Sequence, residues 1–246
     1  YEITTRLVGS EMCIRDRAFP ERSWNGCPVH FSHEPVLLDS GGGVKKIEPL
    51  ASAEEPLLVI NGDMAATFDL RRVMEDHVRH RPAVTLALRT SGDKRNVGFD
   101  FSSGQVTDMR HALGRDPGAC QFTGAYCMEP EVFGRIPPRE IVSIIPVFLD
   151  YIRQGRLRGV LADDGLWMDM GTPEAYIQAH LDFPSPAPRI HPGAEVSSGA
   201  SVDAASVIGP RAVVEEGCRL RECVVWPGAR VPAGTCAERR IFHLSL

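Results

Sequence analysis

Two aspartates stand where a strand-like run gives way to a turn. Asp63 closes an Asn-Gly-Asp sequence directly after the apolar run at 57–60, and Asp169 precedes a Gly-Thr-Pro sequence typical of a helix start. A hydrated Mg²⁺ is usually held by one or two carboxylates together with substrate phosphate oxygens. Because the carboxyl ends of parallel strands share one edge of a sheet, we predict that these two carboxylates converge on one metal ion.

A run of three glycines, Gly41, Gly42 and Gly43, is a third candidate. It follows Asp39-Ser40 and precedes a Val-Lys-Lys sequence that reads like a helix start. Glycine triplets weaken helices and strands alike, so we expect a loop here. Two interpretations are open: a plain flexible connection, or a backbone that comes very close to a phosphorylated ligand.

The elements that must position these residues alternate along the chain. Strand patterns occupy residues 28–35, 55–63, 83–90, 120–128 and 157–171, with a hairpin over 96–110. Helical patterns occupy residues 68–80, 140–155 and 172–181. This alternation predicts an α/β sandwich around a mostly parallel sheet.

Beyond a proline-rich linker at 183–189 the sequence repeats every six residues. Aliphatic residues recur at Ile190, Val196, Val202, Ile208, Val214 and Leu220, and then, after a slip, at Val225 and Val231. A mostly small residue stands four places after each, with Val224 in that position after Leu220. Hexads of this kind stack into triangular coils, so residues 190–243 are predicted to form a short left-handed parallel β-helix.

Composition excludes several classes of protein. The net charge is −5 and there is no long basic run, which argues against a nucleic-acid partner. No apolar stretch approaches the roughly 18 residues that span a membrane. The seven cysteines form no C-x-x-C pair, which favours reduced thiols in a cytoplasmic protein over a disulfide framework or a zinc site.

Four motifs in series resemble those of the sugar-1-phosphate nucleotidyltransferases. They are LLDSGGGVKK, LVINGD, FTGAYCMEPEVF and WMDMGTPEAY, and the hexapeptide repeats follow them. The series is most similar to bacterial mannose-1-phosphate guanylyltransferase-like proteins and covers nearly all of residues 18–240. The resemblance implies a Rossmann-like, GT-A-like sheet in a domain at 18–182. It also implies Mg²⁺-dependent transfer of a guanylyl or uridylyl group from a nucleoside triphosphate to a sugar 1-phosphate.

The resemblance further implies roles for single residues. Asp63 and Asp169 match the catalytic, metal-binding aspartates. The remaining matched residues would bind substrate, and they are Gly41, Gly42, Gly43, Asn61, Gly62, Thr123, Gly124 and, as a substitute for a lysine that binds the sugar phosphate, Arg110. Ordinary structural roles stay open beside these: a turn at Asp63, a cap at Asp169, and a strand bulge at Thr123-Gly124.

Residues 1–17 show no helical or alternating pattern and resemble a translated adapter sequence, so we expect a non-native segment with few contacts. The family's opening strand and Gly-rich phosphate loop have no counterpart between Ala18 and Gly41. We therefore expect an incomplete nucleotidyltransferase sheet in a fragment that is inactive by itself.

Three functions are compatible with the sequence. The first is the nucleotidyltransferase, with assembly as a homo-oligomer through the β-helix as an option. The second is a catalytically silent regulatory relative that binds nucleotide sugar. The third and weakest is a hexapeptide-repeat acyltransferase, for which His191 is the only histidine at the start of the repeats.

Overall fold

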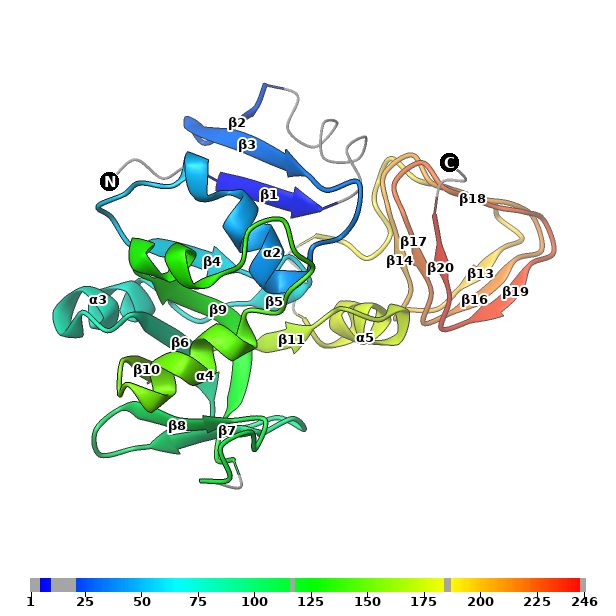
Figure 1. Cartoon of the computed structure of the whole chain (residues 1–246). Coiled ribbons are helices and arrows are strands. Elements are labelled where there is room, and N and C mark those ends of the chain that lie inside the picture. The colour runs from blue at the N-terminus through cyan, green and yellow to red at the C-terminus, as the bar shows by residue number, and fades with distance from the viewer. Residues whose placement is uncertain (1–4, 10–20, 116–117, 184–186, 244–246) are drawn as a thin grey trace. The chain divides into compact units, whose positions relative to one another are not determined.

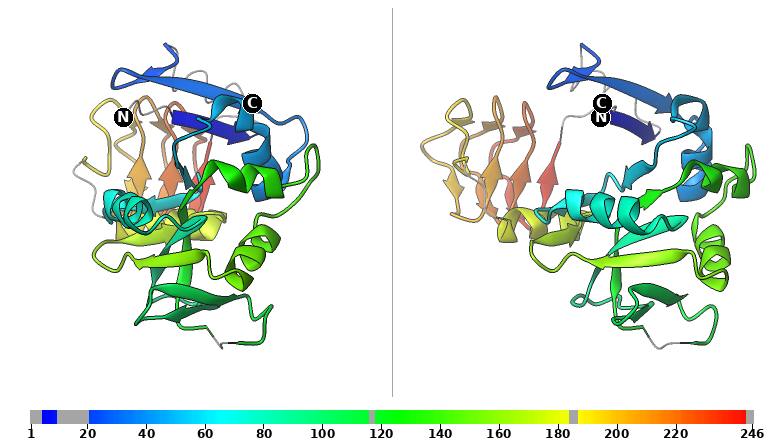
Figure 2. Two further views of the ribbon diagram at one scale, coloured as in Figure 1. Left: turned by 60° about the vertical axis from the view of Figure 1, so that its left-hand side comes forward. Right: turned by 90° about the vertical axis from the view of Figure 1, so that its left-hand side faces the viewer.

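The computed structural model describes residues 5–9, 21–115, 118–183 and 187–243 (Figures 1 and 2). The chain divides into two compact units. Unit 1 comprises Tyr1–Gly62 and Phe68–Gly165, and unit 2 comprises Asp63–Thr67 and Leu166–Leu246. The division therefore falls at Gly165, earlier than the linker that the sequence predicted at 183–189, and unit 2 takes one short segment from the middle of the chain.

Unit 1 is built on a six-stranded mixed sheet. Its order is β4 (Leu57–Ile60), β9 (Gln121–Met128), β6 (Val84–Arg89), β10 (Leu157–Leu161), β8 (Gln105–Met109) and β7 (Val97–Asp100). Only β6 and β10 pair in parallel, and the other four pairs are antiparallel. The prediction of a mostly parallel sheet is wrong, because an unbroken apolar run shows burial on both faces and not strand direction.

Helices cover both faces of this sheet. On β9, Tyr126 packs against Phe148 of α4 (Ile145–Arg153) with ring centroids 5.1 Å apart, while Cys127 contacts Met74 of α3 (Leu70–His80). Neighbouring strand residues point to opposite faces, so α3 and α4 lie on opposite sides. Each face thus buries its apolar side chains, which explains why Val84, Leu86, Ala87 and Leu88 are all fully buried.

Unit 1 also contains three smaller helical elements. They are α2 (Asp39–Lys46) and the 3₁₀ turns η1 (Glu48–Leu50) and η2 (Pro130–Arg135).

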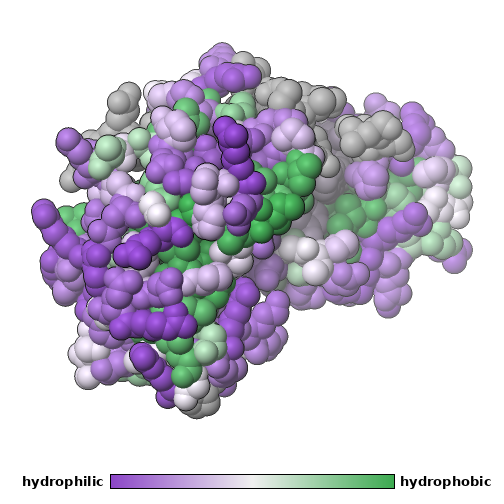
Figure 3. Space-filling view, in the orientation of Figure 1, coloured by the Kyte–Doolittle hydropathy of each residue, from purple (hydrophilic) through white to green (hydrophobic). Residues whose placement is uncertain are grey.

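The face of the molecule in Figure 3 is largely hydrophilic, with hydrophobic patches between the polar side chains. The most exposed large apolar side chains of the described residues are Ile141, Val36 and Leu37.

The amino-terminal strands form a separate three-stranded sheet. In it, β1 (Thr5–Gly9) pairs in parallel with β3 (Cys27–His33), and β2 (Ser23–Trp24) pairs antiparallel with β3. The pairing from Thr5↔Val29 to Gly9↔His33 runs counter to the expectation that residues 1–17 make few contacts. Residues 1–4 and 10–17 of that segment lie outside the described residues.

Unit 2 starts with a two-stranded antiparallel ribbon of β5 (Met64–Ala66) and β11 (Trp167–Asp169), followed by α5 (Pro173–Asp182). Three parallel three-stranded sheets come next. They are β12-β15-β18 (Glu195–Val196, Val213–Val214, Arg230–Val231), β13-β16-β19 (Ser201–Val202, Arg219–Arg221, Cys236–Glu238) and β14-β17-β20 (Val207–Ile208, Val224–Val225, Ile241–Phe242). Three parallel sheets in rotation fit a β-helix of three sides per coil.

The inward ladder follows the predicted hexads. Ile208, Val214, Leu220, Val225 and Val231 are at most 3% exposed. The slip, however, shortens the spacing before the small position: Cys223, and not Val224, stands over Ser206 and donates its N–H to the Ser206 hydroxyl oxygen (2.9 Å). Val224 instead pairs with Val207 in the strand ladder, and it is buried as well.

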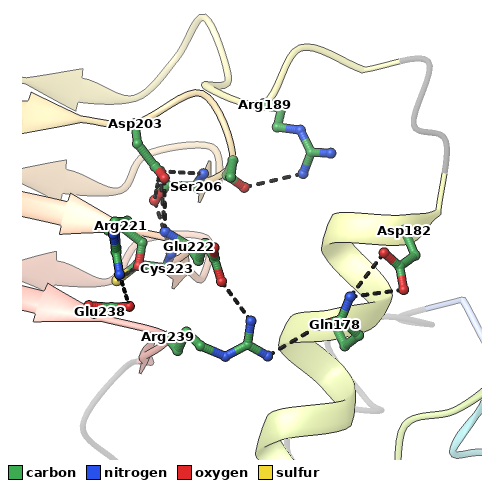
Figure 4. A network of polar contacts seen from close by, with 11 residues as sticks. Gln178, Asp182, Arg189, Asp203, Ser206, Arg221, Glu222, Cys223, Glu238 and Arg239 are labelled. Atoms are coloured by element: carbon green, nitrogen blue, oxygen red, sulfur yellow. Dashed lines mark hydrogen bonds and ion pairs between the residues drawn. The ribbon is translucent and has the colours of Figure 1, made fainter.

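Helix α5 is tied to these coils by polar contacts (Figure 4). The Arg239 guanidinium donates to Gln178 of α5 (3.2 Å) and to Glu222 (2.6 Å). Arg189 donates to the carbonyls of His180 (2.6 Å) and Ala205 (3.3 Å), so it joins the last turn of α5 to the coil.

Within the described residues no helix is long and apolar enough to cross a bilayer.

Candidate functional site

The β5–β11 ribbon brings the two predicted aspartates together. Asp169 is paired with Met64, the residue after Asp63, and the Met170 N–H donates to the Asp63 carbonyl (2.6 Å). Both aspartate side chains are exposed to solvent. The expected convergence is therefore seen, but it comes from a local antiparallel ribbon in unit 2 and not from the shared edge of a parallel sheet.

The carboxylates of Asp63 and Asp169 both lie close to Gly171. Asp169 Oδ1 accepts the Gly171 N–H (2.9 Å). A Cβ placed on Gly171 would lie 3.1 Å from Asp169 Oδ1 and 3.2 Å from Asp63 Oδ2. The two oxygens can therefore be no farther apart than the sum of these distances, which places both carboxylates on the same side of the turn at Gly171.

The start of α5 adjoins this pair. Thr172 has extended backbone and its hydroxyl oxygen accepts the Ala175 N–H (3.1 Å), while Pro173 is the first helical residue. The helix start that the Gly-Thr-Pro sequence predicted is confirmed, and Thr172 is its amino-terminal cap. A helix amino terminus carries partial positive charge, which favours nearby carboxylates.

The acidic pair fits a magnesium ion. Mg²⁺ takes oxygen ligands at about 2.0–2.1 Å and keeps several waters, which two solvent-exposed carboxylates permit. Across the described ranges, no group of three or more His, Cys, Asp or Glu side chains could hold a metal ion. Asp63 and Asp169 would therefore need phosphate oxygens of a substrate or water to complete the coordination.

The glycine triplet is not a loop. Gly41, Gly42 and Gly43 are buried inside α2, and a Cβ on Gly42 would lie 2.4 Å from the carbonyl oxygen of Glu140. At Gly41 the nearest atom would be the Val142 carbonyl oxygen, at 2.7 Å.

The close backbone approach is thus made to the chain's own residues 140–144. The Gly41 and Gly42 N–H groups both donate to the Val142 carbonyl (2.8 and 3.0 Å), and Ile144 N–H donates to the Ser40 hydroxyl (3.1 Å). Because these glycines have no side chains, the first turn of α2 can pack directly against the backbone of residues 140–144, which we call the strap. Nucleotide binding by the same segment stays a prediction.

Thr123 and Gly124 lie on β9 with different roles. Thr123 is buried, and its hydroxyl donates to the Ala87 carbonyl (3.0 Å) where the β6–β9 register shifts between Leu86 and Leu88. Its bond to a bulge supports the structural interpretation that the sequence left open. Gly124 has φ +87, and the Asn61 side chain occupies the space where a Cβ would be, with Nδ2 at 2.8 Å.

Asn61 is held there by its own N–H, which donates to the Gly124 carbonyl (3.0 Å). The structure therefore brings together Asn61 and Gly124, two residues predicted to bind substrate. Gly62, the residue after Asn61, is exposed, and a Cβ on it would meet nothing within 4 Å.

Arg110 stands on an unusual turn. Arg110 and His111 both have positive φ (54° and 58°), and the Arg110 N–H donates to the Asn96 carbonyl (2.7 Å). Asp108, which sequence reasoning passed over, is fully buried below this turn and accepts the N–H groups of Leu113 and Arg115 (3.0 and 2.9 Å). Strand β8 reads Gln-Val-Thr-Asp-Met, with polar residues at three of its five places, so the sequence did not set Asp108 apart.

His191 sits in the first turn of the coil. It is exposed, and its Nδ1 accepts the Gly193 N–H (2.9 Å). Because Nδ1 accepts this bond, the neutral ring carries its proton on Nε2, and Nε2 then cannot act as a general base; this weakens the acyltransferase interpretation.

Comparison with known proteins agrees with the motifs. The sequence profile of the nucleotidyl transferase family matches residues 14–185. A mannose-1-phosphate guanylyltransferase of Mycobacterium tuberculosis is 32% identical over 245 residues, covering 92% of this chain and 67% of that protein. Mannose-1-phosphate guanylyltransferase 1 of Arabidopsis thaliana is 26% identical, and the match covers 78% of this chain but 59% of that protein.

Solved structures show the same fold. A putative glucose-1-phosphate thymidylyltransferase of Bacillus anthracis has a TM-score of 0.61 at 16% identity, over 71% of this chain and 73% of that one. HddC of Yersinia pseudotuberculosis, solved in complex with GMP-PN, has a TM-score of 0.52 at 18% identity, over 68% and 72% of the two chains. Profile match, identity and motif order together assign this chain to the sugar-1-phosphate nucleotidyltransferase family.

Proposed function

We propose that this protein transfers a nucleotidyl group from a nucleoside triphosphate to a sugar 1-phosphate, with Mg²⁺, giving a nucleotide sugar and pyrophosphate. The observation that carries the proposal is the approach of the Asp63 and Asp169 carboxylates to one point at Gly171, in a chain of this family. The chain spans about two thirds or less of the length of the guanylyltransferases it matches, so the activity of the whole protein is inferred.

In the proposed reaction an oxygen of the sugar phosphate forms a bond to the α-phosphorus of the triphosphate. The bond from that phosphorus to the bridging oxygen breaks, and its electron pair leaves with pyrophosphate. No covalent enzyme intermediate is needed, so positioning and charge neutralisation carry the catalysis. Bound Mg²⁺ would neutralise phosphate charge, and the residues that would hold it are Asp63 and Asp169.

For substrates, we propose GTP and mannose 1-phosphate as the first pair to test. Both plant and mycobacterial relatives carry the name mannose-1-phosphate guanylyltransferase. Uridylyl transfer stays the alternative. On the protein side, Asn61 and Gly124 are the candidates for contact with substrate, because the Asn61 side chain lies against Gly124 next to the exposed Gly62. Gly62, Arg110 and the α2 glycines stay proposals of the same kind.

Three further features belong to this proposal. We propose that the coil of unit 2 is left-handed, as hexapeptide repeats favour, and that it can mediate homo-oligomer formation. We place the reaction in the cytoplasm, because the cysteines whose pairing the structure describes are all free thiols, namely Cys27, Cys120, Cys127, Cys218, Cys223 and Cys236.

The test is pyrophosphate release by the 246-residue chain, across a panel of nucleoside triphosphates and sugar phosphates. The same assay tests the expectation that this chain alone turns over slowly. Where turnover is found, Asp63→Asn and Asp169→Asn should each lower it by about 100-fold or more, because they remove charge with little change of shape. Glu195→Gln, an exposed acid on β12, is the control and should leave it unchanged.

Full turnover in either Asn variant would remove that aspartate from the metal site. Tight binding of a nucleotide sugar without any turnover would instead favour the regulatory relative.

A further inference from the structure

We propose that Gly171 is a positioning residue that keeps the Asp63 and Asp169 carboxylates close enough to share one metal ion. This inference rests on the proposed function, because it takes the two aspartates as the metal ligands. Gly171 itself supplies no ligand. Its role is to leave empty the volume that a side chain would take between the two acids.

The geometry around Gly171 shows why a side chain is excluded. A Cβ would lie 3.1 Å from Asp169 Oδ1 and 3.2 Å from Asp63 Oδ2, both tighter than ordinary van der Waals contact. Outside the adjoining residues Met170 and Thr172, these two carboxylate oxygens are the nearest atoms to that position, and the next one, Asp63 Cγ, is 4.0 Å away. The space that glycine leaves is therefore bounded by the reactive ends of the two acids.

The backbone does not demand glycine here. Gly171 is absent from the residues with positive φ, whereas Gly124 and Gly155 have φ of +87° and +67°. Alanine can adopt the conformation of residue 171 without strain. Because the atoms in the way are the ends of flexible side chains, the fold can accept alanine if the carboxylates move by a few tenths of an ångström.

Hydrogen bonds on both sides hold the backbone of Gly171 in place, so the backbone cannot move away from the two carboxylates. On one side the Met170 N–H is bonded to the Asp63 carbonyl (2.6 Å), and on the other Thr172 caps α5 through Ala175 (3.1 Å). The Gly171 N–H also donates to Asp169 Oδ1, which orients that carboxylate (2.9 Å). A larger residue at 171 must therefore push the acids apart and not displace the turn.

Metal affinity is the property most sensitive to this displacement. Mg²⁺ demands near-ideal octahedral geometry with ligands at about 2.0–2.1 Å, so a shift of a few tenths of an ångström in both ligands matters. Changes to residues that only orient the ligands typically weaken metal binding by about 10–100-fold. We expect Gly171→Ala to weaken metal binding by an amount in that range. Gly171→Val should weaken metal binding further, because the two methyl groups of valine add bulk.

The experiment measures binding of Mn²⁺ alone to the full chain by electron paramagnetic resonance, with no nucleotide present. Wild type, Gly171→Ala and Gly171→Val are compared with Gly134→Ala, a control at an exposed glycine where a Cβ would meet nothing within 4 Å. We expect affinity to fall in the order wild type, Ala, Val, with Gly134→Ala equal to wild type. The melting temperature of Gly171→Ala should match that of Gly134→Ala, because the fold is preserved.

A crystal structure of metal-free Gly171→Ala adds a readout that needs no ion: the separation of Asp63 Oδ2 and Asp169 Oδ1 should increase. Unchanged separation, or unchanged Mn²⁺ affinity beside a wild type that binds the ion, would overturn the role of Gly171 and leave the proposed function intact. Wild type that binds no Mn²⁺ while the separation does increase would instead overturn the metal pair of the proposed function. In turnover assays the KM for Mg²⁺ should rise in Gly171→Ala, with kcat restored at saturating Mg²⁺.

Discussion

Gly42 shows how one atom decides the packing of α2. Alanine in a helix interior is normally favoured over glycine by about 0.5–1 kcal/mol. At Gly42, however, the added Cβ would stand 2.4 Å from the Glu140 carbonyl oxygen and 2.8 Å from the Leu38 Cβ, and a backbone oxygen cannot rotate away. We expect Gly42→Ala to lower the free energy of unfolding by about 1–3 kcal/mol, as overpacked sites do.

Urea unfolding of Gly42→Ala checks this value, with Gly134→Ala as the control in open space. A variant more stable than wild type would show that helix propensity outweighs the contact and that α2 does not press on residues 140–144.

His77 predicts a pH dependence of stability. It is fully buried, its Nδ1 lies 2.9 Å from the Thr85 hydroxyl, and its Nε2 lies 3.4 Å from Glu129. Burial lowers the pKa of His77 below its usual value of 6.5, although Glu129 and, more weakly, Asp76 pull the pKa upward. The unfolded chain therefore takes up a proton first as the pH falls through about 6.5, so stability should decrease below that pH.

Denaturation of wild type and His77→Gln between pH 5 and 8 isolates this contribution. His180 also has a lowered pKa through burial, but it is present in both proteins and cancels in the difference. The variant should lose less stability than wild type on acidification, and parallel curves would assign the slope to other groups.

Single residues were predictable where their chemistry is local. The turn after residues 57–60 and the cap at Thr172 could be read from short motifs, and these located Asp63 and Asp169. Gly41, Gly42 and Gly43 could not, because the strap at 140–144 that they meet lies far along the chain. Thr123 was ambiguous for the same reason: its hydroxyl partner, Ala87, is on another strand.

At the scale of elements, the sequence located strands better than it oriented them. The predicted strands at 83–90 and 120–128 correspond to β6 and β9, yet these two pair antiparallel. Apolar runs encode burial on two faces, which α3 and α4 provide, and carry no information on direction. Hexads are different, because their period fixes both the inward face and the stacking partner.

Strand β15 allows a matched test of which side chains of the hexads face the inside of the coil. Val214 is 1% exposed and stacks between Val196 and Val231, whereas Val213 on the same strand is half-buried. Val214→Thr keeps shape and β-branching but buries a hydroxyl, which should cost about 1–3 kcal/mol. Val213→Thr should cost little, and urea unfolding followed by tryptophan fluorescence compares them; equal costs would mean that the inward face is misassigned.

Helix α5 links the repeats to the acidic pair within unit 2. Its first residues follow Gly171, while its later turns contact the coil through Gln178 and Arg189 and through Tyr176, whose ring lies 6.3 Å from that of Trp226. The cationic Arg189 at the carbonyl end of the helix is also the favourable charge there. The repeats thus act as the support for the element that carries the turn beside Asp169.

Two hydrophobic cores set the behaviour of the whole molecule. One gathers Leu86, Tyr126, Phe148 and their neighbours in unit 1, and the other is made of coil residues alone, with no member in common. Separate cores of this kind form separate cooperative units. The chain nevertheless passes between the units more than once, because Asp63–Thr67 belongs to unit 2 while the residues on either side belong to unit 1.

We therefore expect urea unfolding in two steps that different probes separate. Far-UV circular dichroism follows mainly unit 1, which holds α2, α3 and α4, whereas two of the three tryptophans, Trp167 and Trp226, lie in unit 2. Phe148→Leu should shift the dichroism transition, by roughly 1 kcal/mol, and Val214→Thr should shift the fluorescence transition. If each substitution moved both transitions equally, the β5 crossing would couple the two cores into one cooperative unit, and the boundary at Gly165 would mark no separate folding event.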